Sequence, residues 1–220
     1  MRPLVLATLA AATVAQTVTV DVTKAVRERY EAFPYPAVKE GTDDGDVPSE
    51  YHWLRLEQLN QYNYGGTRDD FTGFKVLIAG CGTGGAVVGM AHVLRPWKGA
   101  FVTALDLSAP SVATTRARLE RFGFVEKEHF ALHAMSLLDV AAVTAEPYDL
   151  ILSTGVLHHL ENPLAGLRAL ERVLAPDGAI ALMIYGAIGR SAVYELQHLF
   201  RDELRADGDD DASMLAKVKA

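Results

Sequence analysis

Five short apolar stretches recur along the chain and alternate with segments in which apolar residues repeat at helical spacing. The apolar stretches occupy residues 74–79, 100–105, 130–134, 148–153 and 179–185. Helical segments follow the first two stretches and precede the last one, with prolines at their starts after Ser108 and at Pro163. Strands that alternate with helices form a parallel sheet covered on both faces. The pattern therefore predicts an α/β fold, a three-layer αβα sandwich with a mainly parallel central sheet, and a turn at Pro176-Asp177-Gly178 before the last strand.

The residues before this alternation have a different organisation. Residues 21–32 predict a helix with Asp21 or Thr23 as its N-cap, and Ser49 can cap a second helix. Phe33-Pro34-Tyr35-Pro36 between them must run extended, because each proline fixes φ and disfavours helix at the residue before it. We therefore expect a helical annex over residues 21–72 that covers part of a domain at residues 73–206.

The two ends of the chain need separate interpretations. Residues 1–16 combine Arg2, an apolar stretch and the small residues Thr13-Val14-Ala15, a pattern typical of a targeting segment. The alternatives are an element packed on the domain or a frayed tail, so a cytoplasmic and an organellar location both stay open. The stretch is too short to span a bilayer, which needs roughly 20 apolar residues. Residues 207–220 begin with an acidic run that predicts a solvated tail.

Charge and cysteine usage exclude several classes of function. The chain has 21 Lys plus Arg against 28 Asp plus Glu, a formal net charge of -7, and its sequence shows no dense basic run. Such a surface disfavours nucleic acid as a partner. The single cysteine, Cys81, excludes an intramolecular disulfide and a cysteine-cluster zinc site, and no metal site is predicted.

The candidate chemistry begins at the glycine-rich segment after the first predicted strand. Gly80, Gly82 and Gly85 fit a strand-to-helix turn whose backbone can approach a ligand closely. Asp106 ends the second predicted strand, where an acid can accept hydrogen bonds from both hydroxyls of a ribose. A helix-capping role for Asp106 is the simpler alternative. Together the two features indicate an adenosine-containing cofactor, either NAD or S-adenosylmethionine.

Four motifs in order resemble the class I S-adenosylmethionine-dependent methyltransferases, closest to the small-molecule branch with a Val-Leu-His-His-Leu signature. They are Ala79-Gly80-Cys81-Gly82-Thr83-Gly84, Ala104-Leu105-Asp106-Leu107-Ser108, the segment 148–160 that ends in Val156-Leu157-His158-His159-Leu160, and the run 167–181 around Val173-Leu174-Ala175-Pro176-Asp177-Gly178. This resemblance implies a Rossmann-like fold that binds S-adenosyl-L-methionine and transfers its methyl group. The implied cofactor-binding residues are Gly80, Gly82, Gly84, Asp106, Leu107, Ser136, Leu137, Ser153 and Thr154.

The sequence departs from the family pattern at two places. Ser136 stands where the third motif often carries an Asp that contacts the adenine. A helix is predicted at residues 190–205, but no strand pattern follows it, although the family's sheet normally continues with two more strands. Either the sheet is a reduced five-stranded one or the sequence is a truncated version of a longer chain.

Methyl transfer needs a catalytic base only when the acceptor arrives protonated. His158 and His159 follow the fourth predicted strand and are the base candidates, because the pKa of histidine lies near operating pH. Tyr185, after the fifth strand, is a third catalytic candidate. Capping and packing are the alternative roles for all three. Tyr35, Tyr62 and Tyr64 of the annex are candidates for a lid, and Arg190 and Tyr194 for contact with an anionic or aromatic acceptor.

The family resemblance favours an enzyme with a small-molecule acceptor, methylated at oxygen, carbon or nitrogen, and a protein acceptor is the less favoured alternative. Ser153-Thr154-Gly155-Val156 stands where methyltransferases of base amines carry an (N/D)-P-P-(Y/F) motif, which agrees with the acidic charge. Two alternatives stay open: a catalytically silent methyltransferase-like domain that binds a partner, and an NAD-dependent oxidoreductase. The sequence does not specify an oligomeric state.

Overall fold

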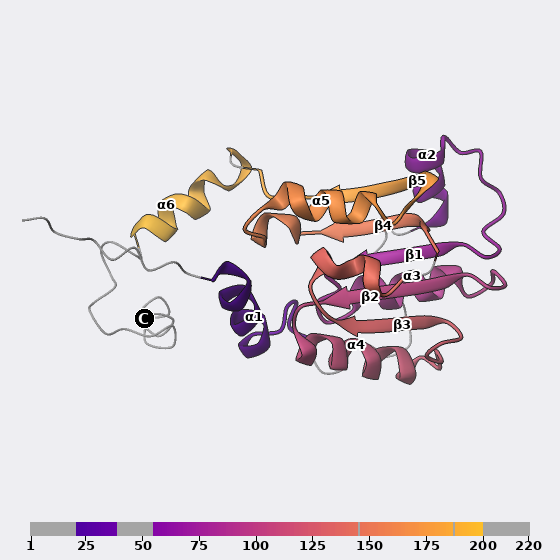
Figure 1. Ribbon diagram of the computed structural model, residues 1–220, viewed down its shortest axis with the longest axis horizontal. Coiled ribbons are helices and arrows are strands. Elements are labelled where there is room, and N and C mark those ends of the chain that lie inside the picture. Colours follow the sequence, from indigo (N-terminus) through magenta and orange to yellow (C-terminus); the bar gives the residue numbers. More distant parts are fainter. Residues whose placement is uncertain (1–20, 39–54, 145, 187, 200–220) are drawn as a thin grey trace, which may run out of the picture.

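The computed structural model describes residues 21–38, 55–144, 146–186 and 188–199 (Figure 1). The predicted targeting segment at 1–16, the Ser49 cap and the acidic tail at 207–220 lie outside these residues. Within them, no helix is both long enough and apolar enough to cross a membrane.

Five parallel strands form the central sheet in the order β3-β2-β1-β4-β5. The strands are β1 (Lys75–Ala79), β2 (Phe101–Asp106), β3 (Phe130–Ala134), β4 (Tyr148–Thr154) and β5 (Leu174–Met183). This sheet confirms the predicted α/β fold, and the order reverses next to β1. Because all five strands run the same way, their carboxyl ends share one edge of the sheet (Figure 1). Ligands of open α/β folds bind at that edge, at the point where the strand order reverses.

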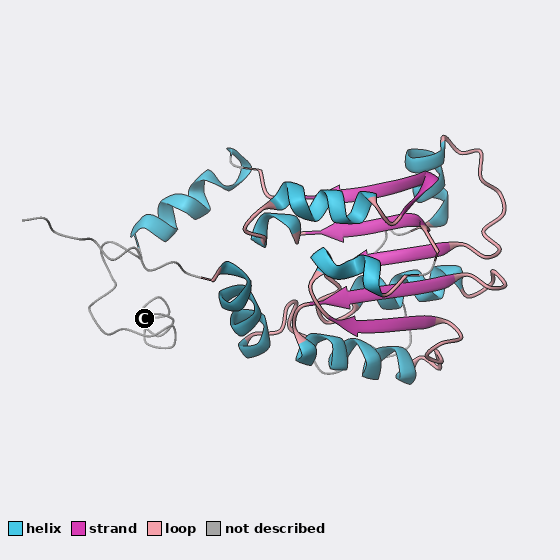
Figure 2. Cartoon of the chain, viewed as in Figure 1, coloured by secondary structure: helices cyan, strands magenta, loops and turns pink. Residues whose placement is uncertain are grey.

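Helices cover both faces of the sheet (Figure 2). Alternate residues of β1 point to opposite faces, so Val76 and Ile78 enter one apolar core while Leu77 and Ala79 enter the other. The first core includes side chains of α2 (Leu56–Tyr64), α3 (Gly85–Leu94) and α4 (Ala109–Arg121); the second includes side chains of α5 (Pro163–Glu171) and the 3-10 helix η2 (Leu137–Ala142). The near-continuous burial of β1 follows from this two-sided cover.

The helix starts follow the capping residues in the sequence. Ser108 Oγ accepts a hydrogen bond from the Ser111 amide at 3.3 Å, and Pro110 lies in the first turn of α4, as predicted. Asn162 Oδ1 accepts from the Ala165 amide at 3.1 Å, and Pro163 begins α5. Proline suits this position because the first amides of a helix have no intrahelical acceptor.

The edge strand β5 begins earlier than the sequence predicts. The expected turn at residues 176–178 is a bulge inside the strand: between the pairs Tyr148–Leu174 and Leu150–Ala179, β4 advances two residues while β5 advances five. An edge strand tolerates proline at such an irregularity, because its outer amides need no partner strand. After β5 come the 3-10 helix η4 (Ile188–Arg190) and α6 (Ser191–Leu199), and α6 falls within the part of the predicted helix 190–205 that the structure describes.

The helix α1 (Val22–Ala32) lies at the carboxyl edge of the sheet (Figure 1), with Asp21 as its N-cap. It contributes no fully buried residue, so hydrogen bonds are important for holding this segment. Ser108 Oγ donates to the Tyr30 carbonyl at 3.1 Å, the Thr83 amide to the Tyr35 carbonyl at 3.3 Å, and Thr83 Oγ1 to the Pro36 carbonyl at 2.7 Å. Segment 30–36 is thus tied to the loops after β1 and β2.

We predict that Gly84→Ala destabilises the fold more than Gly123→Ala. Both glycines have positive φ, +91° and +77°, so alanine pays about 1–2 kcal/mol at either position. At Gly84 a Cβ would also lie 2.6–2.9 Å from atoms of Thr115 on α4, whereas nothing lies within 4 Å at Gly123. Overpacking of this kind adds roughly 1–3 kcal/mol. Urea unfolding of the two variants measures the difference, and equal losses would show that α4 does not constrain Gly84.

Candidate functional site

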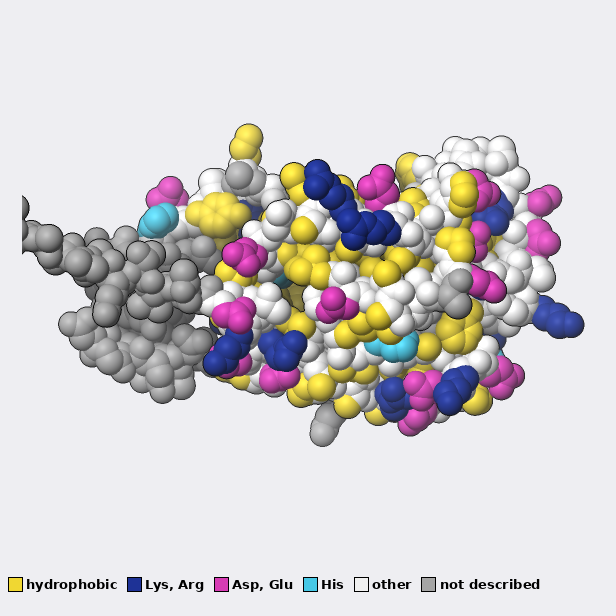
Figure 3. Space-filling model, viewed as in Figure 1, with side chains coloured by type: hydrophobic (Ala, Val, Ile, Leu, Met, Phe, Trp, Pro, Cys, Tyr) yellow, Lys and Arg dark blue, Asp and Glu magenta, His cyan; other side chains and the backbone are white. Residues whose placement is uncertain are grey.

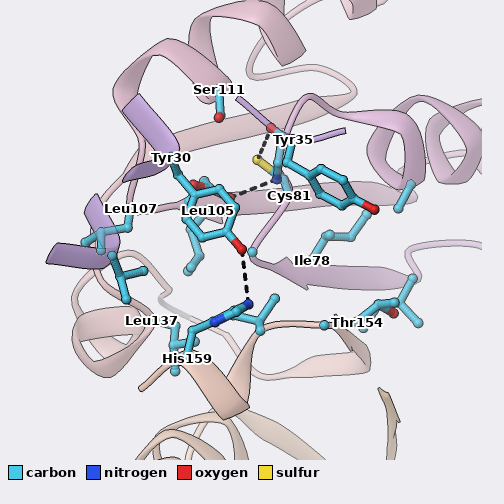
Figure 4. Close-up of a pocket in the computed structure, with 18 of the residues that line it drawn as sticks. Tyr30, Tyr35, Ile78, Cys81, Leu105, Leu107, Ser111, Leu137, Thr154 and His159 are labelled. Carbon is cyan, nitrogen blue, oxygen red and sulfur yellow. Dashed lines mark hydrogen bonds between the residues drawn. The ribbon is translucent and has the colours of Figure 1, made fainter. Parts of the chain in front are cut away.

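A cavity of about 360 Å³ opens at the carboxyl edge of the sheet. Its walls are formed by the glycine loop, the end of β2, the start of η2, α1, Tyr35, the 3-10 helix η3 (Leu157–His159), Met183 at the end of β5 and Tyr185 (Figure 4). The volume lies within the roughly 300–1,000 Å³ of small-molecule sites. Most residues singled out from the sequence line it: Gly80, Gly82, Asp106, Leu107, Ser136, Leu137, Thr154, His159 and Tyr185.

The glycine loop is held from three sides. The Gly82 amide donates to Asp106 Oδ2 at 2.8 Å, and Thr115 Oγ1 donates to the Gly82 carbonyl at 3.0 Å. The guanidinium of Arg118, which is almost completely buried, donates to the Thr83 carbonyl at 2.8 Å. A Cβ on Gly82 would lie 2.3 Å from the Tyr35 carbonyl oxygen, so only glycine allows the N-terminal segment to approach this closely. The loop therefore has a fixed shape without a ligand.

Asp106 accepts hydrogen bonds from backbone amides and also lines the cavity, so it can contact a ligand there. Its Oδ1 accepts from the Ser108 amide at 2.9 Å while Oδ2 accepts from Gly82. Burial raises the pKa of Asp106, and hydrogen bonds from the backbone amides of Ser108, Gly82 and Leu107 oppose that rise. A carboxylate offers about four acceptor positions, so the two oxygens can each accept another donor from a molecule in the cavity.

Ser136 and Leu137 line the cavity beside the glycine loop. The Ser136 hydroxyl accepts from the Leu138 amide at 3.2 Å and caps η2, which fixes the start of this wall. Met135, which the sequence did not single out, lines the same wall. Thioether and leucine side chains here suit the flat faces of an aromatic base.

Three predicted site residues do not line the cavity. Gly84 is the N-cap of α3 and packs against Thr115 of α4. Ser153 is completely buried, and its hydroxyl has no hydrogen-bond partner among the described residues. His158 lies behind the lining residues, with its ring centroid 3.9 Å from that of Tyr185 and 4.3 Å from that of His159. Packing explains the positions of Gly84 and His158.

The cavity wall includes a contact that the sequence did not indicate. Tyr30 of α1 lines the cavity, and its hydroxyl lies 3.0 Å from His159 Nε2 (Figure 4). Their separation of 129 residues leaves no local signal for this contact. Of the three tyrosines considered as a lid, only Tyr35 lines the cavity. Tyr62 is 85% exposed, and Tyr64 donates to the Asp149 carbonyl at the start of β4, at 2.7 Å.

Cys81 lines the cavity but has the properties of a packing residue. Burial raises the pKa of its thiol to about 12, with the nearby Asp106 carboxylate adding to the rise. A thiol with such a pKa stays protonated near neutral pH and is a poor nucleophile. Within the described part of the chain, no group of three or more His, Cys, Asp or Glu side chains could hold a metal ion.

We predict that His159 makes stability depend on pH on the acid side. Burial, then the charges of Arg29 and Arg190, lower the pKa of His159 below its ordinary 6.5, so folding favours the neutral ring. The contribution is therefore complete above pH 6.5 and is lost as pH falls through the lowered folded pKa. Urea unfolding of the wild type and His159→Gln at pH 7.5 and 5.5 measures it. The variant should lose less stability on acidification, and an equal loss in both proteins would contradict the assignment.

Comparison with known proteins adds to this geometry. Residues 77–180 match the family described as a methyltransferase domain. The chain is 39% identical to an uncharacterized protein of Synechococcus over 191 residues, 85% of this chain and 43% of that protein. It is 32% identical over 140 residues to a ubiquinone biosynthesis O-methyltransferase of Xanthomonas oryzae, which covers 63% of this chain and 54% of that enzyme. It is 35% identical over 115 residues to a tRNA 5-carboxymethoxyuridine methyltransferase of Escherichia coli, which covers 52% of this chain and 41% of that enzyme. The chain thus spans about half the length of these relatives.

The solved structure of a magnesium protoporphyrin IX methyltransferase from Synechocystis shares the fold. Its TM-score is 0.53 at 18% identity, with 90% of this chain and 88% of that one covered. Family, fold and the order of the four sequence motifs agree, and S-adenosylmethionine is the cofactor of this family. Residues 77–180 are thus similar to methyltransferase domains, and the fold and motifs support the class I S-adenosylmethionine-dependent family.

Proposed function

We propose that this protein transfers a methyl group from S-adenosylmethionine to a small-molecule acceptor. The observation that carries the proposal is that one cavity is lined by the glycine loop and Asp106 and also by Tyr30, His159 and Tyr185. A methyl donor and its acceptor must meet in line, so both need room in the same enclosed space.

The residues present fit the cofactor. Gly80 and Gly82 expose backbone at the loop, where the amino acid portion would lie. The Asp106 carboxylate retains acceptor capacity for the ribose hydroxyls, and Leu107, Met135 and Leu137 offer apolar contact to the adenine. When bound, S-adenosylmethionine supplies an activated methyl group on a sulfonium. Thr154 at the end of β4 lines the same cavity and would flank the reacting centre.

The walls on the α1 side support an acceptor of limited size. Val26, Tyr35, Met183 and Tyr185 make this part of the cavity largely apolar and aromatic, and α1 crosses the carboxyl edge beside it (Figure 1). Apolar walls exclude water from the reacting atoms. On the face shown in Figure 3, Lys and Arg side chains are mixed with Asp and Glu, and the formal charge of the chain is -7. Neither feature favours a nucleic acid acceptor.

We predict that Asp106→Asn weakens binding of S-adenosylmethionine roughly 10- to 100-fold, because a hydrogen bond to a charged group contributes about 1.5–3 kcal/mol. The amide still accepts through its oxygen, so the Gly82 contact is retained better than in Asp106→Ala. Isothermal calorimetry measures the affinity. Asp139→Asn is the matched control, because Asp139 is exposed on η2 and does not line the cavity.

Titration with NAD completes this experiment. We expect that NAD does not bind. We also expect that Asp139→Asn binds S-adenosylmethionine with the affinity of the wild type. Binding of NAD, or unchanged affinity for S-adenosylmethionine in Asp106→Asn, would contradict the assigned cofactor site. Tight cofactor binding without methyl transfer to any acceptor would favour the partner-binding alternative.

A further inference from the structure

Tyr30 and His159 form a hydrogen-bonded pair in the wall of the cavity. The Tyr30 hydroxyl lies 3.0 Å from His159 Nε2, and the two rings meet edge to face with centroids 5.7 Å apart. Both side chains line the cavity and point toward each other across it (Figure 4). A molecule in this part of the cavity would therefore meet the tyrosine hydroxyl and the imidazole together.

Cationic and aromatic groups surround this pair. His159 contacts His158 on η3 and lies edge to face with Tyr185, their centroids 6.2 Å apart. The Arg190 guanidinium of η4 lies 3.8 Å from the centre of the Tyr185 ring, and its Nε is buried without a hydrogen-bond partner among the described residues. From α1, the charge of Arg29 also acts on His159. Positive charge thus faces the imidazole from both η4 and α1.

The protonation states that follow suit proton transfer. Burial, Arg29 and Arg190 lower the pKa of His159, and burial, His159 and Arg190 lower that of His158, so both rings are neutral near pH 7. Burial raises the pKa of Tyr30, and Tyr185 and Asp106 add to the rise while Arg29 opposes it. A protonated Tyr30 hydroxyl can then donate to the free lone pair of His159 Nε2.

We propose that Tyr30 and His159 form a proton relay that deprotonates an aromatic hydroxyl acceptor, so that this protein is an O-methyltransferase. This inference rests on the function proposed above and names its substrate class. The aromatic walls fit a planar ring, and the positive charge of Arg190, which stacks on Tyr185 without lining the cavity, favours the ionised form of a phenol. The same positive charges disfavour an acceptor that arrives as an ammonium ion. These surroundings therefore favour an acceptor hydroxyl that loses its proton on methylation.

The proton and the methyl group balance in one step. The Tyr30 hydroxyl takes the acceptor's proton and passes its own to His159 Nε2, which becomes an imidazolium. The acceptor oxygen forms a bond to the methyl carbon as the carbon–sulfur bond breaks. The sulfur keeps that electron pair, giving S-adenosylhomocysteine and a methyl ether. Solvent then removes the proton from His159.

Substitutions can remove the relay without detaching α1. Tyr30→Phe keeps the ring and the hydrogen bond from Ser108 Oγ to the Tyr30 carbonyl. The contacts from Thr83 to the carbonyls of Tyr35 and Pro36 also stay. Matched controls are Tyr62→Phe, on the exposed side of α2, and His133→Gln, on β3 and outside the cavity.

The test uses 4-nitrocatechol, whose phenolate absorbs at longer wavelength than its phenol. The probe is added to the protein saturated with S-adenosylhomocysteine, at a pH below the probe's own pKa, and binding and absorbance are recorded together. We expect the wild type and both controls to bind the probe mainly as phenolate. Tyr30→Phe and His159→Gln should bind it with the phenolate fraction reduced at least several-fold toward that of the free probe.

Three results would overturn the relay: no binding of the probe, binding without phenolate absorbance, or a phenolate fraction that Tyr30→Phe and His159→Gln leave unchanged. A merely structural role for Tyr30 would reduce binding but leave the ionisation of the bound probe unaltered. Calorimetry with S-adenosylhomocysteine alone separates the two proposals. If the wild type does not bind it, the methyltransferase function fails and the relay with it; if it does bind, the probe result concerns only the relay.

Discussion

The hydrogen bond from the Gly82 amide to the Asp106 carboxylate joins the ends of the two central strands, and the cavity depends on it. Thr115 and Arg118 of α4 donate hydrogen bonds to the carbonyls of Gly82 and Thr83 in the same loop. The Tyr35 carbonyl lies against Gly82. A loop fixed in this way loses little conformational freedom when a ligand binds, which favours affinity. Under the proposed function, fold stability and cofactor binding therefore share one set of contacts.

This shared use explains why the glycines are not equivalent. Gly82 allows the N-terminal segment to approach, and Gly84 allows α4 to pack, although only Gly82 lines the cavity. The N-terminal segment in turn brings Tyr30 to His159. The contact between Tyr30 and His159 thus depends on the shape of the glycine loop, so a change at the loop should alter both the proposed cofactor site and the proposed acceptor site.

The sequence predicted the sheet, most helix starts and the loop with Asp106, because these depend on local patterns: apolar stretches, capping residues and glycine spacing. It could not predict that Asp106 would hold Gly82, nor that Tyr30 would meet His159, since both depend on how distant segments pack. The bulge around Pro176 was predicted as a turn, because a proline-glycine segment at an edge strand has the same local composition as a turn. Which of the two adjacent histidines faces the cavity was likewise a matter of packing.

Hydrogen exchange with and without S-adenosylhomocysteine tests the location of the cofactor site most directly. We predict that bound S-adenosylhomocysteine slows amide exchange at residues 80–86, 105–108 and 135–138. Exchange in α1 should slow as well, because the ligand fills the cavity beside it. Amide exchange should be unchanged in residues 97–100, which line a second, smaller cavity together with Arg95. Protection confined to that second cavity, or no protection at the glycine loop, would contradict the account.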